Sequence, residues 1–212
     1  MNNKFLEACV FIDKINLSLS TNKNIIATSF MYFNIYYSKY DINILKYDIN
    51  ILCLSCIFLS NKVNEYQNIN NLNKIIKTYD NYNNNYNNIK NNILKFEFQL
   101  IELLGFTFDY KNPYNYLIKY INKINNSINI KKISIKIKQI SWNFINDSLY
   151  TNLCLLYKPN LITIACIYLA TDVLNDELKN IIQWFDLFKC NKNDIINIIN
   201  IILIQYDTYL II

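Results

Sequence analysis

The sequence of 212 residues contains no histidine, no arginine, one glycine and two prolines. Glycine-rich loops that hold phosphates need a close backbone approach that only glycine permits, so sites of that kind are excluded. Without histidine, the commonest general base and metal ligand at neutral pH is missing. We therefore expect a protein that is not an enzyme and that holds neither a cofactor nor a metal ion.

Isoleucine, leucine, lysine and asparagine are abundant instead, which favours long helices joined by short polar links. An all-α fold is the expectation. The six cysteines include a C-x-x-C pair, Cys53 and Cys56, but this pair lies within an apolar run and has no second pair to complete a zinc site. We interpret these cysteines as small buried residues of a reduced, intracellular protein.

The net charge of +5 comes from lysines scattered among asparagines, with no run of four basic residues. Proteins that read base sequence depend on arginine for bidentate contacts with base edges, and this chain has none. Direct binding to nucleic acid is therefore not expected. Membrane insertion is not expected either, because Asp13 and Lys14 interrupt the first apolar run and polar residues interrupt the last, 195–212.

The segment from Ile51 to Glu65, I-L-C-L-S-C-I-F-L-S-N-K-V-N-E, is apolar on most faces of a helix, which is typical of a helix at the centre of a bundle. A similar phrase, L-I-T-I-A-C-I-Y-L-A-T-D-V, recurs about 110 positions later, from Leu161 to Val173. In this alignment Asp172 stands where the first copy has Lys62. Two long copies indicate a duplicated domain, with modules expected at residues 1–109 and 110–212.

Apolar periodicity predicts five helices in each half. In the first half we expect helices over 4–19, from a Ser20 or Thr21 cap to residue 37, and over 51–65, 71–79 and 89–104. We expect Leu94 on the inner face of the last of these helices, Gly105 as its C-cap, and an extended segment over 106–109. In the second half we expect helices over 113–124, 130–156, 159–173, 177–188 and 194–209. The asparagine-rich segment 80–88 is expected to be a loop.

Several phrases of the sequence resemble the cyclin family over nearly the whole chain. I-F-L-S-N-K-V-N-E ends the third predicted helix, and E-F-Q-L-I-E-L-L-G-F forms the fifth. S-W-N-F-I-N-D-S-L and K-P-N-L-I-T-I-A-C-I-Y-L-A are similar to phrases of the second cyclin box in the transcription-associated branch. W-F-D-L-F near the end, and A-T-S-F-M-Y-F-N-I-Y-Y-S-K early on, look most like L-type cyclins, with cyclins K and T next.

This resemblance implies a cyclin fold of two tandem five-helix boxes and a regulatory subunit that binds and activates a cyclin-dependent protein kinase. It implies a role in transcription or RNA processing, in the nucleus with the cytoplasm as an alternative. By the same resemblance, Lys62 and Glu97 hold the mobile C-helix of the kinase. Leu59, Val63, Ile101 and Phe106 match the apolar positions around that pair.

The sequence also departs from the family pattern. Asn64 replaces an acidic residue that usually follows the lysine, and the first helix lacks the Met-Arg-Ala-Ile-Leu groove motif of cell-cycle cyclins. No long Arg-Ser segment is present.

Three alternatives remain open. Lys62 and Glu97 could pair only with each other on a solvated face. The chain could be a two-box scaffold of the general transcription factor type, binding protein or DNA without a kinase. An enzyme would need a polar constellation, and the densest acidic cluster, Asp172, Asp176 and Glu177, is better explained as a helix cap and solvated turn.

Overall fold

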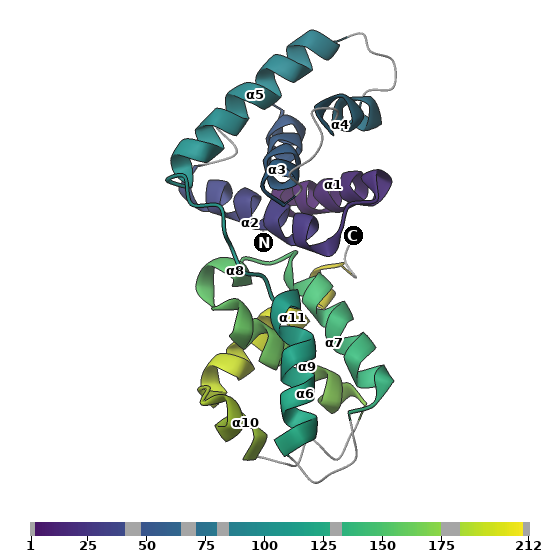
Figure 1. The fold of residues 1–212 in the computed structure, drawn as a ribbon, viewed down its shortest axis with the longest axis vertical. Coiled ribbons are helices and arrows are strands. Elements are labelled where there is room, and N and C mark those ends of the chain that lie inside the picture. The colour runs from purple at the N-terminus through teal and green to yellow at the C-terminus, as the bar shows by residue number, and fades with distance from the viewer. Residues whose placement is uncertain are drawn as a thin grey trace. The chain divides into compact units, whose positions relative to one another are not determined.

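The structure of the chain, a computed structural model, describes residues 3–40, 48–64, 71–79, 85–127, 133–174 and 183–209. Every regular element in these ranges is a helix, as the composition predicts. The chain divides into two compact units, Met1–Tyr110 and Lys111–Ile212 (Figure 1). Each unit has its own core and is described by itself.

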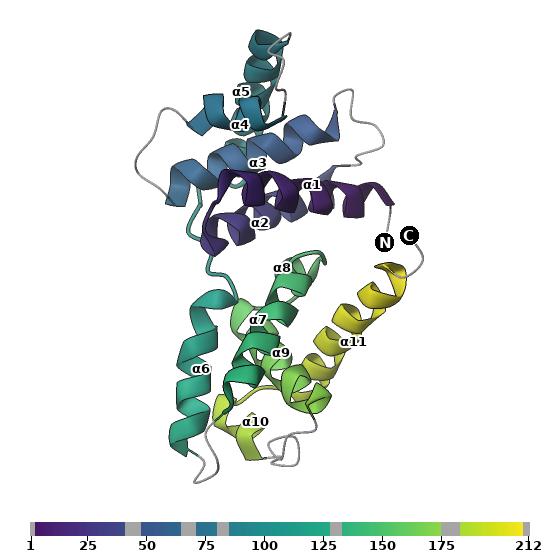
Figure 2. The same ribbon diagram turned by 90° about the vertical axis from the view of Figure 1, so that its right-hand side faces the viewer.

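The described residues of unit 1 form five helices: α1 (Asn3–Leu19), α2 (Lys23–Lys39), α3 (Ile49–Asn64), α4 (Asn71–Tyr79) and α5 (Tyr86–Leu103). The central helix is α3, which packs against all four others. Figure 2 shows it between α1 and α2 on one side and α4 and α5 on the other. Every residue from Ile51 to Asn61 is buried, because an apolar surface around the whole helix needs neighbours on every side.

Small hydroxyl residues let the neighbours of α3 approach closely. The Ser29 hydroxyl of α2 hydrogen-bonds the Ser60 hydroxyl of α3 at 2.6 Å. Ser55 of α3 donates to the carbonyl of Ile51 in its own helix at 2.8 Å and to that of Ile93 in α5 at 3.2 Å. The hydroxyl groups of these serines are buried but hydrogen-bonded. Their small side chains therefore allow the helices to pack closely without the free-energy cost of a buried polar group that lacks a partner.

The ends of two helices in unit 1 show how local chemistry sets the boundaries. The predicted cap of the second helix was wrong: the Asn22 side chain, not Ser20 or Thr21, accepts from the backbone of Ile25 at 3.0 Å. Gly105 does end α5 as predicted, at φ +56°. The amides of Gly105 and Phe106 donate to the carbonyls of Glu102 and Ile101, which is a Schellman arrangement.

Unit 2 contains α6 (Tyr114–Ser127), α7 (Ile135–Ser148), α8 (Leu153–Leu156), α9 (Pro159–Val173), α10 (Gln183–Phe188) and α11 (Lys192–Tyr209). The central helix is α9, which packs against α6, α7 and α11. It begins at Pro159 as the sequence predicts, since proline suits the first turn of a helix.

Four other sequence expectations need correction. The long helix predicted over 130–156 is interrupted after Ser148. The Thr151 hydroxyl stabilises this break by donating to the Ser148 carbonyl at 2.6 Å and accepting from the Leu153 amide at 3.2 Å.

The last helix begins at Lys192 rather than 194, after Asn191. The predicted loop 80–88 is helical from Tyr86, and its residues 80–84 lie outside the described part. Residue 106, expected in an extended segment, has φ +58°. Residues 177–182 of the predicted fourth helix of this unit lie outside the described ranges.

Candidate functional site

The two charged residues singled out in the sequence meet at the surface of unit 1. Lys62 lies in the last turn of α3, where the partial negative charge of the helix end favours a cation. Glu97 lies near the middle of α5. Because α3 and α5 pack together, Nζ of Lys62 approaches Oε1 of Glu97 to 2.7 Å. Residues 35 positions apart thus form one ion pair.

The two members of this pair differ in their exposure to water. The Lys62 side chain is 51% exposed, whereas that of Glu97 is only 8% exposed. The Lys62 ammonium also lies 4.2 Å from the centre of the Phe58 ring, one helical turn earlier. The carboxylate therefore forms the fixed side of the pair, and the ammonium keeps donors directed to solvent.

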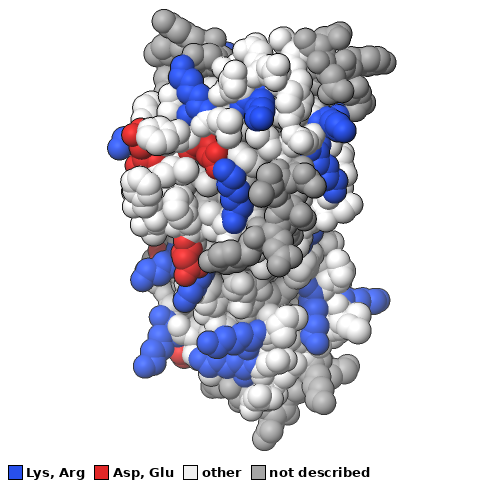
Figure 3. Space-filling view, turned by 45° about the horizontal axis from the view of Figure 1, so that its top comes forward, with Lys and Arg blue, Asp and Glu red and all other residues white. Residues whose placement is uncertain are grey.

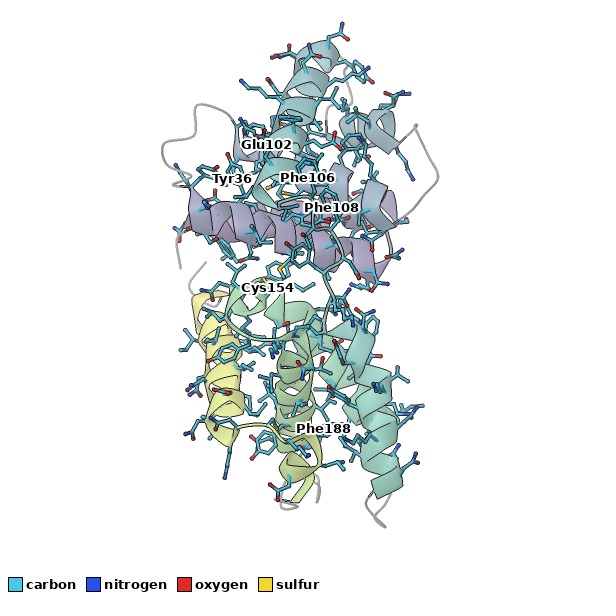
Figure 4. The ribbon with its side chains drawn as sticks, turned by 60° about the vertical axis from the view of Figure 1, so that its left-hand side comes forward. Tyr36, Glu102, Phe106, Phe108, Cys154 and Phe188 are labelled. Atoms are coloured by element: carbon cyan, nitrogen blue, oxygen red, sulfur yellow. The ribbon has the colours of Figure 1, made fainter. Side chains whose placement is uncertain are left out.

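The apolar residues expected around the pair differ in their accessibility. Leu59 is 3% exposed and belongs to the core of unit 1, so it supports the site from beneath. Val63 and Ile101 are half-buried at the surface. Phe106 is 71% exposed and lies just after α5, close in the chain to Glu102 and Phe108 (Figure 4). Only three of the four apolar residues can therefore touch a partner.

Two further apolar residues of α5 belong to this surface, and the sequence analysis did not single them out as such. Phe98 is 61% exposed and Leu94 is 38% exposed, although Leu94 was expected to face inward. With Ile101 they are spaced by four and three residues, so they lie along one face of α5 beside Glu97. The polar pair is thus bordered by an apolar strip, formed by Leu94, Phe98 and Ile101.

The cysteine pair of α3 takes no part in this site. Cys53 and Cys56 are fully buried, and burial raises the pKa of both thiols well above the ordinary value. Buried protonated thiols are poor nucleophiles and poor metal ligands. Within the described ranges, no group of three or more cysteine, aspartate or glutamate side chains could hold a metal ion.

No helix in the described part of the chain is both long enough and apolar enough to cross a membrane.

Comparison with known proteins gives matches in both units. Residues 120–199 match the family model described as Cyclin-T2-like, C-terminal domain. Cyclin-C of Rattus norvegicus is 28% identical over 206 residues, which cover 93% of this chain and 70% of the relative. Cyclin-L2 of Homo sapiens is 35% identical over 107 residues, covering 50% of this chain but only 20% of its own length.

Among solved structures, a chain in the crystal structure of the yeast RNA polymerase II CTD kinase complex CTDK-1 superposes with a TM-score of 0.75. The alignment covers 97% of this chain and 66% of that one, at 16% identity. At this identity the likeness concerns the fold, and it extends over both five-helix and six-helix units described above.

Proposed function

This chain belongs to the cyclin family and has its two-box fold, and from that premise we propose that it is the regulatory subunit of a cyclin-dependent protein kinase. It binds the kinase and activates it, performing no chemistry itself, in the control of transcription or RNA processing in the nucleus. The relatives named above are a cyclin C and a cyclin L2, and the similar solved chain is part of an RNA polymerase II CTD kinase complex, which supports this proposal.

The observation that carries this proposal is the Lys62–Glu97 pair bordered by exposed apolar side chains. The ion pair joins Nζ to Oε1, which leaves Oε2 to accept from a backbone amide of the kinase. The half-exposed ammonium can donate to carbonyls at the end of a helix or loop. A lysine and a glutamate on adjacent helices can in this way hold a partner backbone in one direction.

Self-pairing alone explains the exposed aromatic rings less well. A pair with one member half-exposed contributes about 0–1 kcal/mol to stability, so its value to the isolated chain is small. Phe98 and Phe106 expose more than half of their surface on either side of Ile101. An apolar border around a few directional polar groups is the ordinary composition of a protein interface.

Activation follows from differential binding. A kinase of this type alternates between states with its C-helix outward or inward, and only the inward state brings the C-helix glutamate to the lysine that binds ATP. If the surface around Lys62 binds the inward state more tightly than the outward state, each 1.4 kcal/mol of that preference shifts the equilibrium about tenfold.

Lys62 is the charged residue that ends α3, because the family's acidic residue after the lysine is replaced by Asn64. The Asn64 side chain donates to the Ser60 carbonyl at 2.9 Å.

The test is co-purification of kinase with the tagged chain from its own cells, with kinase activity measured in the eluate. Lys62→Ala combined with Glu97→Ala should abolish both kinase retention and activity. The matched control is Glu7→Ala combined with Lys14→Ala on α1, two exposed residues with the same charges, and it should retain the kinase fully.

Circular dichroism verifies that both variants keep their helices. If the folded wild-type chain retains no kinase, the proposal is wrong and the scaffold alternative takes its place. If the Lys62 and Glu97 variant retains active kinase as well as the control does, the function stands but the assigned site does not.

A further inference from the structure

The basic charge of the chain is concentrated in unit 2. Residues 1–110 contain ten lysines and nine carboxylates, whereas residues 111–212 contain eleven lysines and seven carboxylates. Between Asp109 and Asp147 there are seven lysines and no acidic residue. The lower half of Figure 3, which is unit 2, shows several lysine side chains close together with little acidic surface beside them.

Five exposed lysines lie on neighbouring segments of this unit. They are Lys119 and Lys123 on α6, Lys158 before α9, and Lys189 and Lys192 between α10 and the start of α11. Within the described ranges, none of the five forms an ion pair. Two carboxylates, Asp186 and Asp194, lie on the same segments, so the surface as a whole keeps a positive charge.

Side-chain contacts join these segments. Nζ of Lys123 donates to the Leu187 carbonyl at 2.8 Å and lies 4.9 Å from the centre of the Phe188 ring, which joins α6 to α10. The Tyr120 hydroxyl hydrogen-bonds the Asn160 side chain, which joins α6 to the first turn of α9. Lys158 precedes Asn160 by two residues, and Lys189 directly follows Phe188.

A row of aromatic rings lies on the helices α6 and α10, which also carry or adjoin Lys119, Lys123 and Lys189. The rings of Tyr116 and Tyr120 have centres 5.6 Å apart, and those of Tyr120 and Phe188 are 4.6 Å apart. All three side chains are half-buried, so part of each ring faces solvent. Ammonium groups beside partly exposed rings are the combination that binds single strands, where phosphates meet the charges and bases stack on the rings.

We propose that this surface, formed by Lys119, Lys123, Lys158, Lys189 and Lys192 around Tyr116, Tyr120 and Phe188, binds single-stranded nucleic acid without preference for base sequence. The lack of arginine, which argued against nucleic acid in the sequence, excludes bidentate reading of bases in a duplex. It does not affect a strand held by lysine point charges and by stacking.

The same observations disfavour an acidic or phosphorylated peptide as the partner. Phosphate groups on peptides are usually held by arginine forks in a compact cluster. Here the charges are lysines on three segments, namely α6, the start of α9 and the connection from α10 to α11. This spacing suits a ligand that carries a phosphate at every nucleotide.

Binding is measured by fluorescence anisotropy with the full chain and no kinase, so the result does not depend on the kinase proposal. The probes are a labelled 20-residue oligouridylate, the oligodeoxythymidylate of equal length, and polyglutamate of equal charge. With about four phosphates neutralised, the affinity for either oligonucleotide should fall about 50-fold between 50 and 200 mM salt.

The test variant changes Lys119, Lys158 and Lys192 to glutamine and leaves Lys123, which holds α10, in place. It should bind oligouridylate about 100-fold more weakly at 100 mM salt, since three phosphate contacts are lost. The matched control changes Lys14, Lys39 and Lys77 of unit 1, which are also exposed, and should bind as the wild type does. Tyr116→Leu should weaken oligonucleotide binding about tenfold and leave polyglutamate binding unchanged.

Several outcomes would overturn the proposal. Equal loss in both lysine variants would show a general charge effect with no defined surface. Polyglutamate binding as tightly as the oligonucleotides would assign the surface to acidic peptides. No binding at 50 mM salt would leave a solvated basic face. Preference between the RNA and DNA strands decides only which of the two the surface takes.

Discussion

The central helices of the two units, α3 and α9, share a core and differ at their ends. Cys56 and Cys166 occupy equivalent positions and are both fully buried. Seven residues after these cysteines both helices carry a valine, of which Val63 is half-buried and Val173 is 56% exposed. The last turn carries Lys62 in α3 and Asp172 in α9. The two helices therefore share buried residues of the core and differ in the charged residue of the last turn.

The surfaces of the units have diverged in the same sense. Unit 1 combines one ion pair with exposed apolar rings, a composition suited to a protein partner. Within its described residues, unit 2 presents lysines that form no ion pair, on segments that also carry aromatic rings, a composition suited to a polyanion. One helical framework thus supports two kinds of surface, because the framework depends on buried positions alone.

The largest expected effect tests whether the two cores are equivalent. Ile57 of α3 and Ile167 of α9 are 0% and 1% exposed. Changing either to alanine should cost about 4 kcal/mol of unfolding free energy, since each leaves a cavity in a packed core. Urea unfolding with one probe in each unit, such as Trp142 fluorescence for unit 2, measures the cost. A loss confined to one variant would show that only one central helix is indispensable.

The next largest effect is expected when the charged residues at the ends of α3 and α9 are exchanged. Lys62→Asp gives α3 the residue of α9 and places a second carboxylate beside Glu97. Kinase affinity should fall about 100-fold, or roughly 2.7 kcal/mol. Asp172→Lys, the reverse exchange in α9, should leave kinase affinity unchanged. Surface plasmon resonance with the co-purified kinase measures both, and a loss in the α9 variant would contradict the assignment of the site to unit 1.

The smallest expected effect concerns the stability cost of a partly buried carboxylate, which differs between Glu97 in unit 1 and Asp147 in unit 2. Glu97 is paired with a cation, whereas the Asp147 side chain of α7 accepts a hydrogen bond from the neutral Tyr206 hydroxyl. Burial raises the pKa of Asp147, and the Tyr206 hydrogen bond only partly opposes that shift. A raised folded-state pKa means that ionised Asp147 destabilises unit 2 at neutral pH, and that this cost disappears below the ordinary value of 3.8.

Asp147→Asn should therefore raise the thermal midpoint of unit 2 at pH 7 and leave it unchanged at pH 3.5. Calorimetry at the two pH values measures the shift. A lower midpoint at pH 7 would mean that the ionised carboxylate contributes favourably through its bond to Tyr206.

The sequence predicted the elements whose signals are local. The central helices, the proline that begins α9 and the glycine that ends α5 each depend on a few adjacent residues. The break after Ser148 was missed because no glycine or proline marks it. It depends instead on the Thr151 hydroxyl and on the burial of Leu149 and Leu153, which only the folded unit reveals.

The candidate site was predictable only in part. The resemblance to cyclins singled out Lys62 and Glu97 as residues that hold a kinase, whereas their 2.7 Å contact with each other is the pairing that the alternative interpretation expected. The exposure of Leu94 and Phe98 was missed because α5 is apolar on more than one face. Periodicity does not show which of two apolar stripes the core covers. The role of these residues in kinase binding stays a prediction.

At Phe106, whose backbone has a positive φ, stability and partner binding favour different amino acids. A bulky residue at φ +58° strains the backbone, and glycine there would remove the strain. Yet the exposed ring contributes nothing to the core. In a library of variants sorted for abundance, glycine at this position should be enriched. In the same library sorted for partner binding, it should be depleted, so this one residue would separate what the fold prefers from what its surface is for.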